Sequence, residues 1–270
     1  MNAPRPRLLT IAGSDSGGGA GIQADLKTFA AHGAFGMSAI TALTAQNTLG
    51  VRAVYGVPPE FVAAQIDAVF EDIGVDALKI GMLAGTGIVA AVAGRLRVHA
   101  GPPVVLDPVM AAASGDPLLE PEAVAAIRDL LLPLATVITP NLPEADRLAG
   151  HPAPDLEARR ELARELGRRA PAVLLKGAHA PGDEIVDLLW DGRELYSFAH
   201  PRLATRGGHG TGCTLSAAIA ARLATGTPLA EACRGAIAWL EGALRHALPI
   251  GHGQAPLDPF WQFLPSEVRA

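Results

Sequence analysis

The amino-acid sequence predicts an α/β protein in which helices cover both faces of a mostly parallel central sheet. Short apolar runs alternate along the chain with longer amphipathic runs in which apolar residues recur at helical spacing. Polar residues gather at the carboxyl ends of the apolar runs, where α/β sheets bind their ligands. No Pro/Gly/Ser-rich linker or shift in composition divides the chain, so we expect residues 1–270 to form a single domain.

Most expected elements have a local signal. Residues 7–15 predict a strand that ends in a glycine loop, and Gly33 ends the helix that begins at residue 21. Residues 38–48 are rich in β-branched side chains and predict a strand, whereas prolines open the helix at 58–74. The order then continues with strand 77–83, helix 86–100, strand 103–110, helix 120–133, strand 135–141, helices 142–150 and 155–170, strand 172–179, a hairpin-type pair at 184–192 and 194–203, and helices around 211–225 and 228–247.

Composition excludes several classes of protein. The 270 residues are 49% hydrophobic and 18% charged, which is typical of a globular protein with a large core. The formal net charge is -5 and no Lys/Arg cluster stands out, so we expect no nucleic-acid partner. No apolar run is long enough for a membrane span, the N-terminus lacks the features of a signal peptide, and two cysteines suggest no disulfide framework. We expect a cytoplasmic protein.

Six predicted strands end in residues that could contact a ligand. Because the carboxyl ends of parallel strands meet at one edge of a sheet, we expect these residues to line a single cleft. In chain order they are Gly13, Ser14, Asp15, Gln46, Asn47, Met82, Asp107, Asn141 and Lys176.

The first glycine loop, "AGSDSGGGAGIQAD", permits a dinucleotide-binding interpretation. Gly19, Gly21 and Ala24 have the relaxed spacing of that fingerprint after a strand, but the acidic residue expected about 20 positions later is missing. The P-loop pattern also fails, because no Gly-Lys-Ser/Thr follows either glycine run. Hydride transfer is therefore weakly supported, and one glycine loop could hold an acceptor while the other holds a phosphate.

The second glycine loop, "GGHGTGCTLSAAIAA", leads directly into a helix. The first backbone N–H groups of a helix have no partners within it, and with the helix dipole they form a site for an anion such as a phosphate. We expect Gly210, Thr211 and Gly212 to supply these groups, and Cys213 to have a lowered pKa. The alternative is an ordinary loop capped by Thr211, with a structural cysteine.

Four polar residues between positions 107 and 176 each have two interpretations. Asn141 and Glu144 could hold a hydrated Mg²⁺ through one carboxylate and water, or form a capping box. Asp107 follows an apolar strand as a metal- or phosphate-side group, or as a turn residue. Lys176 could meet a phosphate as a point charge, or lie at the surface.

Seven motifs occur in one order along the chain: "GSDSGGGAGIQADLKTF", "TALTAQNT", "KIGML", "VVLDPVM", "ITPNLPEA", "LLKG.H" and "HGTGCTLSAAIAA". Together they resemble the hydroxymethylpyrimidine/phosphomethylpyrimidine kinases of thiamin biosynthesis, which belong to the ribokinase-like superfamily. The resemblance covers roughly residues 7 to 250. It implies ATP-dependent phosphorylation of 4-amino-5-hydroxymethyl-2-methylpyrimidine, and then of its monophosphate to the pyrophosphate. It also implies Mg²⁺ as cofactor and a homodimer.

The resemblance assigns roles to particular residues. It implies that Gln46 recognises the pyrimidine and that Gly13, Asp25 and Met82 occupy other pocket positions. The "GTGC" segment matches the anion hole, in which Cys213 stands where most ribokinase relatives have an aspartate base. Asn141 and Glu144 match the Mg-phosphate motif. With Asp107 and Lys176 beside ATP and Mg²⁺, these residues make up the predicted site.

Three departures from the family pattern qualify this assignment. Ser16 and Gly17 replace a Pro and a Ser, so we expect a more flexible first loop. Gly207-Gly208 replace Asn-Thr, and Ile237 stands where a lysine is common, which puts contacts to nucleotide or phosphate in doubt. A pyridoxal or pyridoxamine kinase on the same scaffold remains the nearest alternative, and a non-catalytic pyrimidine-binding module is a further one.

Overall fold

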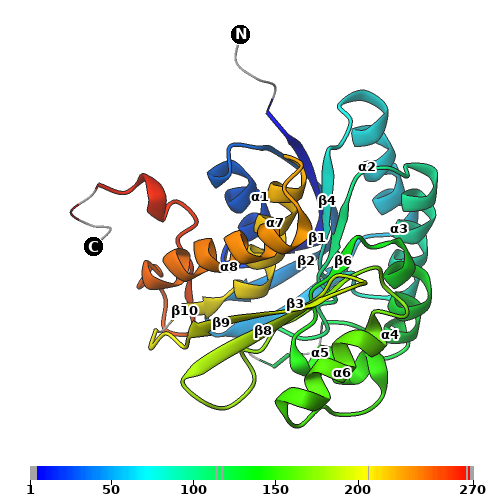
Figure 1. The fold of residues 1–270 in the computed structure, drawn as a ribbon. Helices are drawn as coiled ribbons and strands as arrows, with labels where there is room; N and C mark the ends of the chain where they lie inside the picture. Colours follow the sequence, from blue (N-terminus) through cyan, green and yellow to red (C-terminus); the bar gives the residue numbers. More distant parts are fainter. Residues whose placement is uncertain (1–4, 113–114, 117, 206, 266, 268–270) are drawn as a thin grey trace.

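A nine-stranded sheet forms the centre of the protein (Figure 1). The computed structural model describes residues 5–112, 115–116, 118–205, 207–265 and 267. The strand order is β3-β2-β1-β4-β5-β6-β7-β8-β9. The strands are β1 (Arg7–Asp15), β2 (Phe35–Asn47), β3 (Gly50–Gly56), β4 (Ala77–Ile80), β5 (Val104–Leu106), β6 (Val137–Ile138), β7 (Val173–Leu175), β8 (Glu184–Trp190) and β9 (Leu195–Pro201).

The central part of the sheet is parallel, as predicted. Every pairing from β2 through β1, β4, β5 and β6 to β7 is parallel. The antiparallel pairings lie at the two edges, where β3 joins β2 and the hairpin β8–β9 joins β7. All six parallel strands therefore end at the same edge of the sheet.

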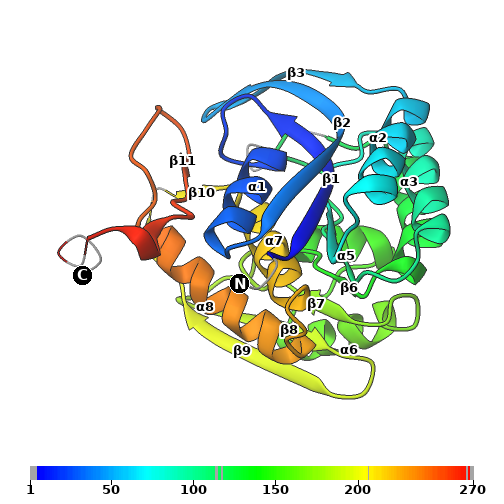
Figure 2. The ribbon, with the colours of Figure 1, turned by 90° about the horizontal axis from the view of Figure 1, so that it is seen from above.

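Helices cover both faces of the sheet, as Figures 1 and 2 show. Leu9 and Ile11 of β1 join one buried cluster with α2 to α6, whereas Leu8 joins a second cluster with α1, α7 and α8. This alternation follows from the period of two in a strand. The helices are α1 (Gly21–Ala31), α2 (Pro59–Asp72), α3 (Thr86–Val98), α4 (Ala123–Ala126), α5 (Leu142–Ala149), α6 (Leu156–Leu166), α7 (Thr211–Leu223) and α8 (Leu229–Arg245). None of the helices in the described ranges is long and apolar enough to cross a membrane.

The structure differs from the predicted elements in three places. Strand β3 was not predicted, because it is a largely exposed edge strand without a buried face. The helix expected at 120–133 is α-helical only over Ala123–Ala126, and it continues as a π-turn (Ile127–Leu131) and a 3₁₀ turn (Leu132–Leu134). A small parallel ladder of β10 (Gly207–His209) and β11 (Ala255–Pro256) was also missed. It holds the second glycine loop against the C-terminal segment.

Candidate active site

A cavity of about 760 Å³ opens at the carboxyl ends of the parallel strands. The expectation of one cleft along this edge is confirmed, because residues from six strand ends line it together with the start of α7. Asn47 lies instead on a neighbouring hollow of about 220 Å³ that shares Gln46 with the cavity. The predicted site residues on the cavity wall are Gly13, Gln46, Met82, Asp107, Asn141, Glu144, Lys176, Gly210, Thr211, Gly212 and Cys213.

Asp107 and Lys176 form an ion pair on the cavity wall. Lys176 Nζ lies 2.8 Å from Asp107 Oδ1, which the Thr139 hydroxyl also approaches at 3.2 Å. Burial opposes a charge on Lys176, but the carboxylates of Asp107 and Glu144 raise its pKa. Asp107 is only 1% exposed, and its Oδ2 atom has no hydrogen-bond partner among the residues that the structure describes. The pair therefore places the Lys176 ammonium on the cavity wall, with Asp107 Oδ2 beside it as an acceptor that makes no hydrogen bond in the described residues.

Asn141 and Glu144 form the capping box at the start of α5. The Asn141 side chain accepts from the Glu144 backbone N–H at 2.9 Å, and Glu144 Oε2 accepts from the Asn141 N–H at 2.8 Å. Burial raises the pKa of the Glu144 carboxyl to about 7, while Lys176 opposes the rise and Asp107 adds to it. The two interpretations of this motif are compatible, because a capping carboxylate on the cavity wall can also face a cation.

The start of α7 faces the Asp107–Lys176 pair. A Cβ atom on Gly212 would lie 3.2 Å from Lys176 Nζ and 3.3 Å from Asp107 Oδ2. Gly210 precedes the helix as its N-cap with a φ of 84°, and no side chain caps the helix. The Thr211 hydroxyl donates to the Gly208 carbonyl at 2.9 Å, so the cap by Thr211 that the alternative interpretation requires is not formed. The first N–H groups of α7 thus remain available beside a lysine, as an anion site requires.

Cys213 does not have the lowered pKa that its place at the start of a helix predicts. Burial raises the pKa of the thiol to about 11. The Lys79 ammonium and the Gly21 backbone N–H oppose the rise, whereas Asp25 and Asp107 add to it. Desolvation outweighs the helix N-terminus here. Cys213, a half-buried residue that lines the cavity, therefore carries a neutral thiol at rest.

Asp25 lies behind the cavity wall rather than on it. Its carboxylate is fully buried, with Oδ2 2.9 Å from Lys79 Nζ and 2.6 Å from the Thr10 hydroxyl. Lys79, which is also fully buried on β4, lines the cavity in its place. Burial opposes the charge on Lys79, but Asp25 holds its pKa well above the usual value. Asp25 is thus connected to the cavity through its ion pair with Lys79, and its part in binding a pyrimidine stays a prediction.

Gly13, Met82 and Gln46 form the wall nearest the first glycine loop. A Cβ atom on Gly13 would lie 2.9 Å from Met82 Sδ, so a side chain at position 13 would require Met82 to shift. The Thr44 hydroxyl lies 3.0 Å from both Gln46 Oε1 and the Ser14 carbonyl oxygen, so these two acceptors share its one proton beside the Gln46 amide on β2. This wall combines an apolar surface with one amide, which suits a small heteroaromatic ring.

These features can be compared with known proteins. The family model described as phosphomethylpyrimidine kinase matches residues 15–258. The chain belongs to the phosphomethylpyrimidine kinase family. It is 54% identical over 258 residues to the hydroxymethylpyrimidine/phosphomethylpyrimidine kinase of Rhizobium meliloti, a match that covers 93% of this chain and 96% of the relative. It is 50% identical to the thiamine biosynthesis bifunctional protein ThiED of Geobacter sulfurreducens, with 94% of this chain matching 52% of that longer protein.

The fold is shared with solved kinases. The crystal structure of an ADP complex of Bacillus subtilis pyridoxal kinase superposes with a TM-score of 0.89 at 35% identity, covering 97% of this chain and all of that one (100%). The predicted ribokinase-like fold is confirmed, and the protein is a kinase, which is a phosphotransferase that implies the use of ATP. Membership of a kinase family leaves the hydride-transfer and non-catalytic interpretations without support.

The departures from the family pattern have structural consequences in this kinase. Ser16 was expected to loosen the first loop, yet its hydroxyl donates to the Gln46 carbonyl at 2.7 Å and accepts from the Gln46 N–H at 2.8 Å. A Cβ atom on Gly207 would lie 2.7 Å from the Cβ of Ala247, so a side chain there requires a shift. Ile237 lines the cavity but packs in the core around α8.

Sequence reasoning gave no role to Lys79 or His209, and it placed Asp15 only among the strand-end residues expected to line the cleft. Lys79 occurs in an apolar strand, where a buried lysine needs a partner, and this requirement was the available signal. Asp15 and His209 are both buried on the cavity wall and lie 2.7 Å apart, although 194 residues separate them in the chain. The sequence contains no signal for that pairing.

Proposed function

We propose that this kinase phosphorylates hydroxymethylpyrimidine and then its monophosphate, with ATP as phosphoryl donor. The observation that carries the proposal is that the start of α7 and the Asp107–Lys176 pair line the same cavity as Gly13, Gln46 and Met82, on a different wall of it. One wall suits a phosphoryl group, and the other suits a small ring that bears a hydroxymethyl group. The names of the relatives described above support the substrate class.

Binding of the pyrimidine is assigned to the wall that contains Gly13, Gln46 and Met82, which we call the pyrimidine wall. The Gln46 amide offers a donor and an acceptor to the aminopyrimidine edge, and its Oε1 lies 3.0 Å from the Thr44 hydroxyl. Met82 and Gly13 leave a flat apolar surface beside it. A site that pairs both a donor and an acceptor discriminates strongly against rings that lack them.

Phosphoryl transfer is assigned to the wall formed by the start of α7 and the Asp107–Lys176 pair, which we call the phosphoryl wall. The hydroxymethyl oxygen forms a bond to the γ-phosphorus of ATP, the bond from that phosphorus to the β-γ bridging oxygen breaks, and ADP leaves. Backbone N–H groups of Gly210, Thr211 and Gly212 stabilise the charge on the transferring group, and Lys176 adds a cation. Cys213 takes the hydroxymethyl proton in the fraction of molecules that carry its thiolate.

A magnesium ion fits the residues around Asp107. Mg²⁺ is usually held by one or two carboxylates together with waters and substrate phosphates. Asp107 Oδ2 is an unpartnered oxygen, and the Glu144 carboxylate lies on the same wall, so these two residues would hold it. No cluster of three or more acidic, His or Cys ligands occurs in the described residues, which suits an ion that relies on phosphate oxygens. When bound, Mg²⁺ would neutralise charge on the phosphates.

Pyridoxal is the second candidate substrate. The specific observation that favours it is the close superposition on a pyridoxal kinase, with a TM-score of 0.89. Pyridoxal is also a small heteroaromatic ring with a hydroxymethyl group. The identity to that kinase is 35%, compared with 54% to the Rhizobium meliloti enzyme, and we therefore place the pyrimidine first.

The experiment that tests the function is a coupled assay of ADP release. The purified enzyme is given ATP and Mg²⁺ with hydroxymethylpyrimidine, its monophosphate or pyridoxal, and the products are separated by chromatography. We expect the highest kcat/KM with the pyrimidines. A higher kcat/KM with pyridoxal would reverse the assignment.

We further propose that residues 1–270 make up one kinase domain that assembles as a homodimer. A single sheet that takes strands from Arg7 to Pro201 supports the first part. The second part rests on the family resemblance alone, and sedimentation of the purified chain would test it.

A further inference from the structure

The two glycine loops of the active site lie against each other. The first loop, Ser16–Ala20, connects β1 to α1, and the second, Gly207–Gly210, leads into α7. A Cβ atom on Gly210 would collide with the Gly19 carbonyl oxygen, and one on Gly19 would collide with the His209 ring. The backbones are therefore in direct contact, and glycine is needed on both sides of this contact.

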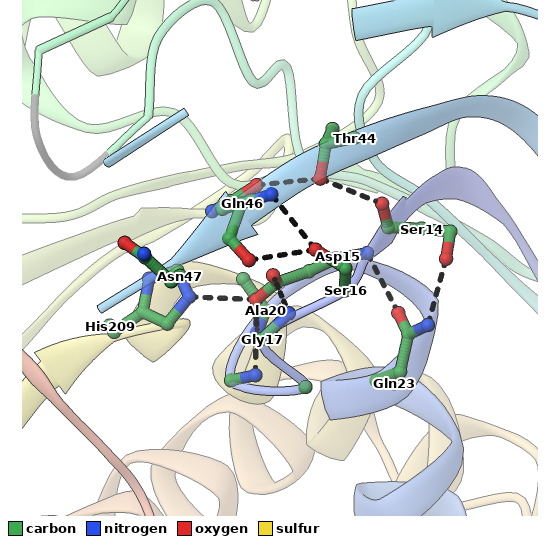
Figure 3. Close-up of polar contacts among 12 residues, drawn as sticks. Ser14, Asp15, Ser16, Gly17, Ala20, Gln23, Thr44, Gln46, Asn47 and His209 are labelled. Carbon is green, nitrogen blue, oxygen red and sulfur yellow. Dashed lines mark hydrogen bonds and ion pairs between the residues drawn. The ribbon is translucent and has the colours of Figure 1, made fainter. Parts of the chain in front are cut away.

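Asp15 and His209 join the loops by a buried hydrogen bond. His209 Nε2 lies 2.7 Å from Asp15 Oδ2, and the two side chains are 9% and 2% exposed (Figure 3). Because a carboxylate oxygen can only accept, the ring proton must reside on Nε2. His209 is the residue directly before the N-cap of α7, so this bond acts at the base of the anion site.

Asp15 also organises the whole first loop. Its Oδ1 accepts from the Gly17 N–H at 2.7 Å, and its Oδ2 accepts from the N–H groups of Gly19 at 3.0 Å and Ala20 at 2.9 Å. Burial opposes the charge, but the His209 bond and the backbone N–H groups keep the pKa of Asp15 below its usual value. The carboxylate is thus the centre around which the loop is wrapped, and His209 connects that centre to α7.

The same loop is attached to the wall that is assigned to the pyrimidine. Ser16 bonds the Gln46 backbone on β2, and the Asp15 backbone N–H donates to Gln23 Oε1 at 2.9 Å (Figure 3). The Gln23 amide in turn donates to the Ser14 hydroxyl at 2.8 Å. A continuous set of hydrogen bonds therefore runs from Gln46 through the first loop to His209.

We propose that Asp15 and His209 are positioning residues that hold the pyrimidine wall and the phosphoryl wall in register. This inference rests on the proposed function of the two walls. Neither residue has to touch the reacting atoms. Their bond fixes the spacing between Gln46 and the start of α7, and hence the distance between the hydroxymethyl oxygen and the phosphoryl group. In-line transfer depends steeply on such spacing.

The test compares His209→Leu and Asp15→Asn with the wild-type enzyme. Loss of a hydrogen bond to a charged group predicts a drop in kcat of about ten- to hundredfold, with a smaller change in the KM for either substrate. His209→Gln, which retains an N–H donor close to the position of Nε2, should recover most of the loss. The double variant should be no worse than the poorer single one, because the pair acts as a unit.

The chain provides a matched control. His99 and Asp67 form a second His–carboxylate pair at the same 2.7 Å, between α3 and α2 and away from the cavity. His99→Leu should keep kcat within about threefold of the wild type, even where it lowers the melting temperature. A purely structural role for His209 predicts that His209→Leu and His99→Leu behave alike, and that His209→Gln does not recover activity.

A second measurement does not depend on the substrate. Release of the first loop should expose Cys213, so iodoacetamide should modify it at least threefold faster in His209→Leu than in the wild type or in His99→Leu. If the wild-type enzyme does not phosphorylate the pyrimidine, the proposed function is wrong. The rate of Cys213 modification then still tests the positioning role of Asp15 and His209. Unchanged modification, or kcat losses that add in the double variant, would overturn the positioning role.

Discussion

Cys213 must lose its proton before it can act as a base, and its surroundings oppose this loss. Burial raises the pKa of the thiol to about 11, so roughly one molecule in a thousand carries the thiolate at pH 8. A free cysteine with a pKa of about 8.5 is about one quarter ionised at that pH. The thiolate fraction of Cys213 is therefore about two hundredfold smaller.

The expected result is a steep dependence on pH. Only the form without the proton is reactive, so the rate of modification by iodoacetamide should rise about tenfold per pH unit between pH 7 and 10. If Cys213 is the general base, kcat should rise over the same range. Mass spectrometry of the modified peptide measures the first rate, with the fully buried Cys233 as an internal reference. A plateau near pH 8.5 or below would refute the reasoning.

Two substitutions should move this pKa in opposite directions. Lys79 favours the thiolate and Asp25 opposes it, so Lys79→Met should raise the pKa of Cys213 and Asp25→Asn should lower it, each by about one unit or more. Lys79→Met leaves a buried carboxylate without its partner and is expected to lower stability. The double variant Lys79→Met with Asp25→Asn avoids that cost and should bring the pKa back toward that of the wild type. Shifts in the same direction for both single variants would show that Lys79 and Asp25 act on packing rather than on charge.

Removal of the thiol completes this series. General acid–base catalysis contributes about 10²- to 10⁴-fold, so Cys213→Ala should lose on that order in kcat while it still binds pyrimidine and ATP. A phosphoryl transfer with a loose transition state needs little removal of the proton, and in that case the loss stays below tenfold. The kcat of this variant, measured together with both affinities, separates the two mechanisms. A kcat equal to that of the wild type would make Cys213 a packing residue.

Three further results are expected. Gln46→Leu should raise the KM for the pyrimidine or abolish turnover while ATP binding survives, and an unchanged kcat/KM would contradict its assignment. Glu144→Gln retains a capping oxygen but loses the charge, so activity should fall and require more Mg²⁺; a change confined to the melting temperature would mean that the residue only caps α5. Gly210→Ala should lower both stability and kcat, because the new Cβ would meet the Gly19 carbonyl at a φ of 84°. Gly226 has a similar φ of 79° but open space around it, so Gly226→Ala should lower the free energy of unfolding by only about 1–2 kcal/mol. Similar losses of stability in both alanine variants would show that the contact between the loops is not tight.

The sequence predicted the fold where apolar burial determines the structure. Strands β4, β5, β6 and β7 are short and fully buried, so their apolar runs were visible without any knowledge of their partners. Strand β3 carries exposed residues at the edge of the sheet, and only its pairing with β2 makes it a strand. The helix predicted at 120–133 changes from α-helical to π and then 3₁₀ hydrogen bonding around Pro133. The periodicity of apolar residues does not predict this change.

The candidate site was predictable where it depends on strand ends and less so where it depends on packing. The positions of Gln46, Met82, Asp107 and Lys176 on the cavity follow from the parallel order of their strands. The state of Cys213 does not, because the helix N-terminus is local and the burial that outweighs it is set by α1 and β4. For the same reason the sequence motif placed Asp25 in the pocket, whereas the folded chain places Lys79 between Asp25 and the cavity.

The arrangement of charges explains why an acidic kinase can hold an anionic donor in this cavity. Each carboxylate near the start of α7 is partnered: Asp25 by Lys79, Asp107 by Lys176, and Asp15 by His209 together with three backbone N–H groups. Their negative charges are thus largely balanced within the protein, which leaves the N–H groups of α7 and the field of Lys176 for the phosphates. The same surroundings keep Cys213 mostly protonated, so only a small fraction of molecules carries the thiolate base. Rate enhancement must then come mainly from the fixed spacing of the two walls, and this is why the bond between Asp15 and His209 is expected to matter more for kcat than for the affinity of either substrate.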